Sequence, residues 1–393
     1  MSGIIQGLII QPKNTLIKMK LMLLKGALLL IVIQSIVTFG HLAVYRTLVK
    51  FFNIQNLGLV SGLKISLIVL SVSFLLASIL ANNFIGSIIN GLYTASAVWM
   101  GTFYWLLIAT GLAWLLSYAA KFFGLNLPDF YLAVALFGLA IVISGYGVIH
   151  SYQTQVVTYR VSLPNLPAAW QGKKIVFMAD THLGNVRGAW FISRTADLID
   201  RQKPEMVLVP GDYYDGPPAD YNSLAKDMAS RIHAPLGIYF TSGNHEEFRD
   251  SQGYLDALRT AGIKIINNQK VEINGLQIVG TDYFGNNTNE GLAKTLAGMS
   301  IDKSKPSIML KHAPLAVKAA AEAGISLMVS GHTHQGQMWP LGYLTNWIHK
   351  GFGYGLNKYG NMTVVTTSGV GTWGPPQRVG TQSEIVVLQL ENK

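Results

Sequence analysis

The pattern of hydrophobic and polar positions divides the chain into two parts. Up to about residue 150, long apolar segments follow one another, each close to the roughly 20 residues that a helix needs to cross a membrane. This pattern predicts an α-helical, multi-span membrane domain over residues 1–150, with helices at Leu21–Val44, Ile65–Ile89, Ala95–Ala120 and Phe130–Ile149. The segment Met1–Ile10 is also apolar but too short to span, and we expect it to lie at the membrane surface.

From residue 151 onward the apolar runs become short. Residues 151–172 contain a proline-punctuated stretch and are predicted to form a linker. Beyond it, β-rich runs such as Lys174–Met178 and Met206–Val209 alternate with helical patterns such as Ala189–Arg201. This alternation is typical of an α/β domain, which we expect to cover residues 173–393.

Composition and charge support a membrane protein. Half of the residues are hydrophobic and 13% are charged, whereas about a quarter are charged in ordinary soluble domains. Residues 1–150 hold eight Lys or Arg and one acid, and the remainder holds 22 bases and 19 acids. The second part is therefore close to neutral, and long nucleic acids are not expected as partners. The absence of cysteine excludes disulfides, thiolate metal sites and cysteine nucleophiles.

The basic residues that flank the predicted spans bear on orientation. Four spans place the N-terminus and the second domain on the same side of the membrane. Bases are more frequent in cytoplasmic loops. The predicted flanks of that side hold Lys13, Lys18, Lys20, Lys25 and Arg160, against Arg46, Lys50, Lys64 and Lys121 on the other. We therefore expect a multi-pass protein of the cell membrane with its second domain on the cytoplasmic side.

Polar residues gather where the predicted strands end, which is where open α/β sheets place their sites. These residues are Asp180, His182, Asp212, Asp215, Asn244, His245, His312, His332 and His334. Five of the nine histidines belong to this set. Carboxylates, imidazoles and amide oxygens suit divalent metals such as Mn, Fe, Zn or Ni. The groups are too many for one ion but suffice for two ions about 4 Å apart.

The order of these motifs resembles the signature of the calcineurin-like metallophosphoesterases. The series is Asp180-x-His182, Gly211-Asp212-x-x-Asp215, Gly243-Asn244-His245-Glu246, His312 and Gly331-His332-x-His334. The resemblance covers roughly residues 170–393 and is closest to bacterial phosphodiesterases that carry a membrane anchor. It implies a four-layer α/β/β/α sandwich. One departure is Gln335, which stands where a glycine is more usual in the family.

The resemblance also implies a role for each matched position. Asp180, His182 and His334 would hold one metal ion, Asn244, His312 and His332 the other, and Asp212 would bridge the two. His245 would stabilise the transition state or protonate the leaving oxygen, while Asp215 and Glu246 would support the site. Two divalent ions, with manganese as the leading choice and Fe, Zn or Ni as alternatives, would turn a bridging water into the attacking hydroxide. Arg378 and Arg187 are candidates for contact with a substrate phosphate, or for structural ion pairs.

The sequence therefore predicts a membrane-bound, binuclear-metal phosphoesterase that cleaves phosphodiester or pyrophosphate bonds. The nearby bilayer suits a lipid-linked substrate, and the aromatic stretch Trp339–Tyr354 is either a lip for its tail or ordinary packing. A nucleotide phosphodiesterase that uses the spans only as an anchor is an alternative. A non-enzymatic sensor, scaffold or transporter is another, although the spans offer no acid except Asp129 at an edge. The oligomeric state stays open.

Overall fold

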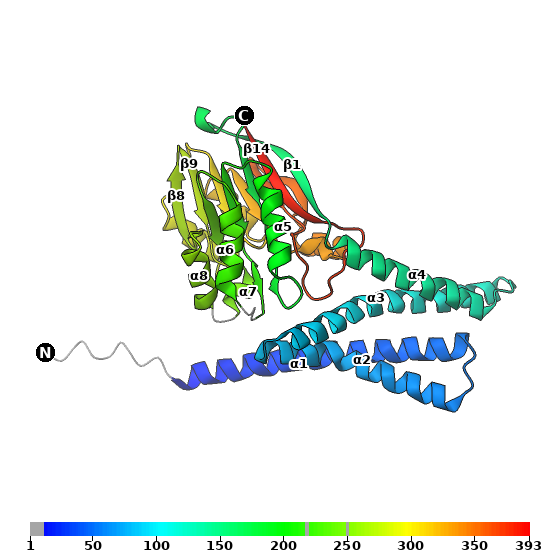
Figure 1. The fold of residues 1–393 in the computed structure, drawn as a ribbon. Helices are drawn as coiled ribbons and strands as arrows, with labels where there is room; N and C mark the ends of the chain where they lie inside the picture. Colours follow the sequence, from blue (N-terminus) through cyan, green and yellow to red (C-terminus); the bar gives the residue numbers. More distant parts are fainter. Residues whose placement is uncertain (1–11, 217–219, 249–250) are drawn as a thin grey trace. The chain divides into compact units, whose positions relative to one another are not determined.

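The computed structural model describes residues 12–216, 220–248 and 251–393. Four of its helices are long and apolar enough to cross a membrane, as predicted. They are α1 (Pro12–Phe51), α2 (Leu57–Asn83), α3 (Ser87–Phe122) and α4 (Asp129–His150) (Figure 1). The predicted second span ran past the observed end of α2 at Asn83, because the apolar pattern continues through the turn into α3. The predicted surface segment Met1–Ile10 lies outside the described residues.

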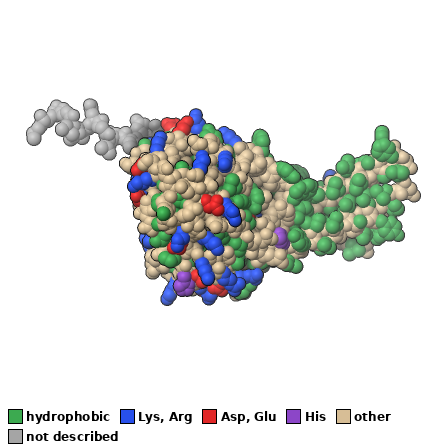
Figure 2. Space-filling view, turned by 90° about the horizontal axis from the view of Figure 1, so that it is seen from above, with side chains coloured by type: hydrophobic (Ala, Val, Ile, Leu, Met, Phe, Trp, Pro, Cys, Tyr) green, Lys and Arg blue, Asp and Glu red, His purple; other side chains and the backbone are tan. Residues whose placement is uncertain are grey.

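The long helices carry apolar side chains that protein does not cover. Phe39 and Leu57, for example, are 70% and 81% exposed. Figure 2 shows hydrophobic side chains gathered over the helical part, whereas lysines, arginines and acids gather over the α/β part. An uncovered apolar surface of this kind is what a lipid bilayer accommodates. The chain thus associates with a membrane.

The chain forms two compact units. One combines the residues up to 76 with residues 103–140, and the other combines residues 77–102 with residues 141–393. The second unit contains the whole α/β part, together with the end of α2, the start of α3 and the end of α4.

Two six-stranded sheets form the centre of the α/β part. The first has the order β1 (Thr154–Leu163), β14 (Ser383–Asn392), β2 (Lys174–Phe177), β4 (Met206–Pro210), β6 (Ile238–Thr241) and β7 (Lys264–Ile265). The second has the order β12 (Gly355–Tyr359), β13 (Met362–Thr366), β11 (Leu327–Ser330), β10 (Ser307–Leu310), β9 (Leu276–Gly280) and β8 (Gln269–Ile273). Most neighbouring strands are parallel, so their carboxyl ends meet at one edge.

Alternating side chains explain how the sheets pack. In β2, Ile175 and Phe177 join a core that also contains Ile308 and Val329 of the second sheet. The intervening Val176 joins a core with the helices α5 (Ala189–Asp200), α6 (Tyr221–Arg231) and α8 (Ser251–Thr260), which cover the outer face of the first sheet (Figure 1). The helices α9 (Asn289–Ala297) and α10 (Val317–Glu322) pack on the second sheet. The fold is therefore the expected α/β/β/α sandwich.

Local sequence explains where several helices begin. The Asp220 side chain accepts a hydrogen bond from Ser223 N at the start of α6, and Thr288 does the same for Gly291 N at the start of α9. Such caps satisfy backbone donors that the helix itself leaves free. In α5, Phe191, Ile192, Ala196 and Ile199 lie on the buried face at helical spacing.

The stretch predicted as a linker, residues 151–172, is in part a strand. Strand β1 pairs in parallel with β14 along ten residues, from Thr154 opposite Ser383 to Leu163 opposite Asn392. The prolines that suggested a linker come after this strand, and the partner of β1 lies more than 200 residues away, where no local pattern can indicate it. The predicted limits of the two domains stay a prediction.

Candidate metal centre

The seven predicted metal ligands lie together at the carboxyl edge of the two sheets. Asp180 and His182 follow β2, Asp212 follows β4, and Asn244 begins the short helix α7 (Asn244–Glu247) after β6. From the second sheet, His312 follows β10, and both His332 and His334 follow β11. Parallel strands with adjacent carboxyl ends therefore bring together residues up to 154 positions apart in the sequence.

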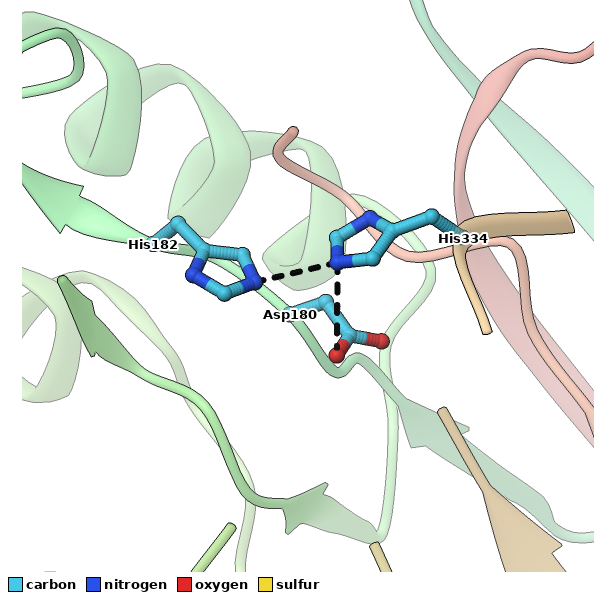
Figure 3. A group of neighbouring side chains, drawn as sticks. All are labelled: Asp180, His182 and His334. Carbon is cyan, nitrogen blue, oxygen red and sulfur yellow. Dashed lines mark hydrogen bonds and ion pairs between the residues drawn. The ribbon is translucent and has the colours of Figure 1, made fainter. Parts of the chain in front are cut away.

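One group of candidate ligands consists of Asp180, His182 and His334. Figure 3 shows the three side chains directed toward one another. His182 Nε2 lies 3.1 Å from His334 Nε2, which lies 3.9 Å from Asp180 Oδ1. One ligand atom from each residue lies within 4.8 Å of the other two. All three residues are buried.

A second group consists of Asp212, His312 and His332, with Asn244 beside them. His312 Nε2 lies 3.1 Å from Asp212 Oδ2, 3.1 Å from Asn244 Oδ1 and 3.2 Å from His332 Nδ1. The other nitrogen, Nδ1, lies 2.9 Å from the carbonyl oxygen of Pro210 and donates to it, so in a neutral ring Nε2 carries a lone pair. Several hydrogen-bond acceptors then lie close together, an arrangement that a positive charge would stabilise. The residues present thus fit a divalent cation.

The pKa shifts favour the neutral imidazole in three of the candidate ligands, His182, His332 and His334. Burial lowers the pKa of His182 to about 4 and of His332 to about 3, and it also lowers the pKa of His334. The neutral imidazole is the form that binds metals. Burial acts in the same direction on His312, but the negative charge of Asp212 prevails and raises its pKa to about 9. A cation at this point would take the place of that proton.

The backbone at the ligands is strained. Asp180, His182, Asp212, His332 and His334 have φ angles of 55°, 49°, 53°, 70° and 48°. This left-handed region costs a residue other than glycine roughly 1 kcal/mol or more. Such strain concentrates at functional sites, where the surrounding structure maintains it. The next residue, Gln335, shares the conformation with a φ of 51°, which a glycine would adopt without this strain.

Two buried features fix the Asp212 loop against the Asn244 loop. Gly211 has a φ of 84°, and a Cβ there would lie 2.5 Å from Gly243 N, so only glycine fits. The buried Glu246 carboxylate accepts hydrogen bonds from the backbone N–H groups of Asp212, Tyr213 and Gly243 at 2.8–2.9 Å. A supporting role for Glu246 accords with these contacts.

His245 lies at the edge of the ligand cluster. Its Nδ1 is 3.1 Å from Asp215 Oδ1, and its Nε2 is 4.0 Å from Asp212 Oδ2. Its side chain is 18% exposed, more than that of His182 or His312. Burial opposes protonation, but the hydrogen bond with Asp215 and the nearby acids raise the pKa of His245 to about 9. The ring is thus oriented by Asp215 and can hold a proton beside the ligands.

A cavity of about 470 Å³ opens on these ligands. One part of its lining consists of His182, Asp212, Asn244, His245, His332 and His334. Another part is apolar and comes from helix α11 (Leu341–Ile348) and its surroundings: Met338, Leu341, Leu344, Ile348, Trp373 and Pro375. His349 also lines the cavity. Sequence analysis missed Trp373 and His349, because neither belongs to a metal-ligand motif.

The two arginines predicted to contact a phosphate lie elsewhere. Both are buried, and neither lines the cavity. Arg187 donates to Thr372 Oγ1 at 2.8 Å and to the Ser151 carbonyl at 3.0 Å. Arg378 donates to the carbonyls of His334 and Gly371 at 3.2 Å and 2.7 Å. Because the two terminal nitrogens of each guanidinium group donate to backbone or hydroxyl acceptors, the geometry favours a role in holding loops over the predicted phosphate contact.

Comparisons with known proteins find similarity to phosphoesterases in each case. Residues 173–336 match the model of the family described as calcineurin-like phosphoesterase. An uncharacterised metallophosphoesterase of Campylobacter jejuni is 32% identical over 243 residues, which cover 61% of this chain and 64% of that protein. A zebrafish (Danio rerio) transmembrane protein with a metallophosphoesterase domain is 29% identical over 270 residues, or 64% of this chain and 60% of that protein.

An uncharacterised metallophosphoesterase of Aquifex aeolicus is 29% identical over 262 residues, which cover 65% of this chain and 98% of that protein. The chain thus spans less than two thirds of the Campylobacter and zebrafish proteins, but nearly all of the Aquifex protein. The family match, residues 173–336, includes all seven candidate metal ligands from Asp180 to His334.

Proposed function

We propose that this protein is a membrane-bound, metal-dependent phosphoesterase that cleaves phosphodiester or pyrophosphate bonds, because residues 173–336 match the model of the calcineurin-like phosphoesterase family. The observation that carries the proposal is the position of Asp212 between the two ligand groups. Its Oδ2 lies 3.1 Å from His312 Nε2 and 3.9 Å from His182 Nε2. One carboxylate within a few ångströms of histidines from both ligand groups supports a binuclear centre rather than two separate sites.

In this proposal Asp180, His182 and His334 would hold one divalent ion, Asn244, His312 and His332 would hold the second, and Asp212 would contribute to both sites. Manganese is the leading choice, with iron, zinc or nickel as alternatives. When bound, two such ions polarise phosphoryl oxygens and lower the pKa of water enough to supply a nucleophile near neutral pH. The buried, strained loops hold the seven ligands in place before substrate arrives, so little reorganisation is needed during the reaction.

His245 donates a proton from Nε2 to the leaving oxygen. Its Nδ1 is occupied by Asp215 at 3.1 Å, so Nε2 is the nitrogen available to the cavity. The raised pKa of about 9 keeps this proton present at neutral pH in the free site. A histidine within reach of the departing group is a suitable general acid.

The substrate in this proposal is lipid-linked. The cavity continues from the ligands to an apolar lining formed by Leu341, Leu344 and Ile348 of α11. No residue of this helix is buried, and Trp347 on it is 78% exposed. An exposed apolar helix beside a phosphoesterase site is costly in water but suits a hydrocarbon chain next to a phosphate. The candidate membrane spans in the same chain add to this argument.

The catalytic domain in this proposal lies on the cytoplasmic side of the cell membrane. The support is the small excess of basic residues on the flanks that share a side with residues 151–393. Protease added to sealed spheroplasts tests the assignment. We expect residues 160–393 to survive until detergent is added, and early cleavage in this range would place the domain outside.

Metal add-back tests the proposed activity. The purified protein is stripped of metal and assayed on bis-p-nitrophenyl phosphate with Mn, Fe, Zn or Ni supplied singly. We expect activity with at least one metal, and a loss of about a hundredfold or more in Asp212→Ala, as for other preorganised electrostatic groups. Asp256→Ala is the matched control, because Asp256 is exposed and pairs only with neighbours on its own helix.

Two outcomes separate the alternatives. Full activity in Asp212→Ala would rule out the binuclear arrangement, and inactivity with every metal would favour a non-enzymatic sensor or scaffold. A nucleotide phosphodiesterase with the spans as a simple anchor would cleave soluble nucleotide diesters as fast as a nucleotide-linked lipid in mixed micelles. We expect the lipid to be preferred.

A further inference from the structure

One segment of the cavity lining connects the ligand loops with the long helices. Residues 372–379 form a loop on which Trp373 and Pro375 line the cavity, and the Trp373 ring centroid lies 6.4 Å from that of His245. This loop, together with residues 77–102 and 141–151 of the helical segments, belongs to the second compact unit. Hydrogen bonds connect the loop with different partners on its two sides.

On the first side, the loop is bound to the segment that contains the candidate ligands. The Gln337 side chain accepts a hydrogen bond from Trp373 N at 3.0 Å and donates to the carbonyl of Pro375 at 2.6 Å. Arg378 of the loop donates to the carbonyl of His334, a candidate ligand, and to that of Gly371. Any shift of the loop would therefore move both the cavity wall and the backbone of a ligand.

On the second side, the loop is bound to α3 and α4. Gln377 is fully buried, and its Nε2 donates to Ser144 Oγ at 3.0 Å and to the Val98 carbonyl at 3.3 Å. Arg378 N donates to the carbonyl of Gly147 at 2.9 Å. Ser151, just past the end of α4, donates through Oγ to the carbonyl of Pro376 at 3.0 Å. Two helices that are candidate spans are thus hydrogen-bonded to a loop that lines the cavity.

Glycines in α3 and α4 leave the space in which the loop side chains contact these helices. A Cβ at Gly101 of α3 would lie 2.6 Å from the Gln377 amide, and a Cβ at Gly147 of α4 would lie 2.8 Å from Val379 Cγ2. Both distances are shorter than real Cβ contacts allow, so a larger residue would force the side chain of Gln377 or Val379 out of its place. By contrast, a Cβ at Gly111 of α3 or Gly145 of α4 would meet nothing within 4 Å.

We infer that Gln377 is a positioning residue through which α3 and α4 set the position of the Trp373–Pro375 wall of the cavity. The inference rests on the proposed function, and it gives the helices a part in shaping the site in addition to anchoring the chain. A buried amide with two hydrogen bonds in a glycine-lined recess fixes the loop more tightly than apolar contact would, because leaving those partners unpaired is costly.

Two measurements on Gln377→Met test the inference. Methionine keeps the length of the side chain but loses both hydrogen bonds. Amides of residues 372–379 in the metal-free protein should exchange with deuterium at least about threefold faster, since local opening controls exchange. The KM for a lipid-linked substrate should rise about tenfold, with a smaller change in kcat, because a misplaced wall weakens positioning. Gln382→Met, at a partly exposed glutamine nearby, is the matched control.

Gly101→Ala provides an independent test from the helix side. It should reproduce the rise in KM by pushing against the Gln377 amide, while Gly111→Ala on the same helix should not. Adding Gln377→Ala to Gly101→Ala should restore part of the loss, because the shorter side chain removes the clash. This non-additivity is not expected of two mutations that merely destabilise the fold.

The outcomes separate this inference from the proposed function. Unchanged exchange in Gln377→Met, or equal harm from Gly101→Ala with and without Gln377→Ala, would overturn the positioning role. Exchange is measured without metal or substrate, so faster exchange in Gln377→Met supports the positioning role of Gln377 even if the wild-type protein proves inactive. Activity of the wild type on bis-p-nitrophenyl phosphate is tested separately.

Discussion

The two sides of the cavity are built in contrasting ways. On the ligand side, buried residues adopt strained backbone conformations and are tied to one another, as when His332 N donates to the Asp180 carboxylate at 2.9 Å. On the opposite side, α11 exposes apolar residues and buries none. In the proposed function, the side that would bind phosphate is therefore fixed before substrate arrives. The side that would meet the rest of the substrate is exposed and has fewer packing constraints.

The largest effect should come from the fixed side. His312→Ala removes the nitrogen on which Asp212, Asn244 and His332 converge. We expect kcat/KM to fall by about a hundredfold or more, the range for preorganised groups at reacting centres. Bound metal, measured by elemental analysis, should fall by about one ion per chain. His233→Ala, at an exposed histidine, is the control. Unchanged metal content in His312→Ala would contradict the ligand assignment.

An intermediate effect should follow from crowding the fixed side without removing a ligand. A Cβ at Gly331 would clash with the Asp180 carboxylate. We therefore expect Gly331→Ala to lower kcat/KM by about tenfold, since small displacements of reacting groups are costly. Thermal melting in detergent should show a destabilisation of about 1–3 kcal/mol, as for other overpacked sites.

Gly253→Ala is the matched control for Gly331→Ala, because a Cβ at Gly253 would meet nothing within 4 Å. If Gly331→Ala bound metal and turned over substrate like the wild type, the ligand side would be less rigid than its backbone indicates.

The smallest effect should come from the adaptable side, and it should depend on the substrate. Leu344→Gln makes the apolar lining polar at one position of α11. We expect the KM for a lipid-linked substrate to rise about threefold to tenfold, a fraction of what full burial of a leucine contributes. Activity on bis-p-nitrophenyl phosphate should not change.

Trp347→Gln lies on the same helix but outside the cavity lining, and it should leave both substrates unaffected in detergent. Equal losses on both substrates in Leu344→Gln would indicate that α11 supports the fold rather than a hydrocarbon chain.

Much of the fold and most of the candidate site could be predicted from the sequence, because both rest on local patterns. Long apolar runs specify spanning helices whatever surrounds them, and α1 to α4 follow from them. Alternation and turn residues indicated the strands that precede each motif. The motif order then indicated which residues would meet, and His332 and His334 belong to separate groups of possible ligands, while their assignment to two metal ions stays a prediction.

Other features could not be predicted in this way, because they depend on partners far away in the sequence. The positive charge of Arg187 and Arg378 suggested contact with a phosphate, but only the fold shows that their terminal nitrogens donate to backbone carbonyls and, in Arg187, to a hydroxyl. Strand β1 has a partner only because β14 returns beside it.

The sequence by itself thus determined the kind of chemistry and the presence of membrane spans, since ligand types and apolar length are properties of short segments. The tertiary structure decided how the cavity is enclosed. Gln377 and Ser144 are 233 residues apart and meet only in the folded chain. The exposure of α11 likewise could be known only from the structure, because it depends on which other segments build the core. Packing is a property of the whole molecule, and no local pattern contains it.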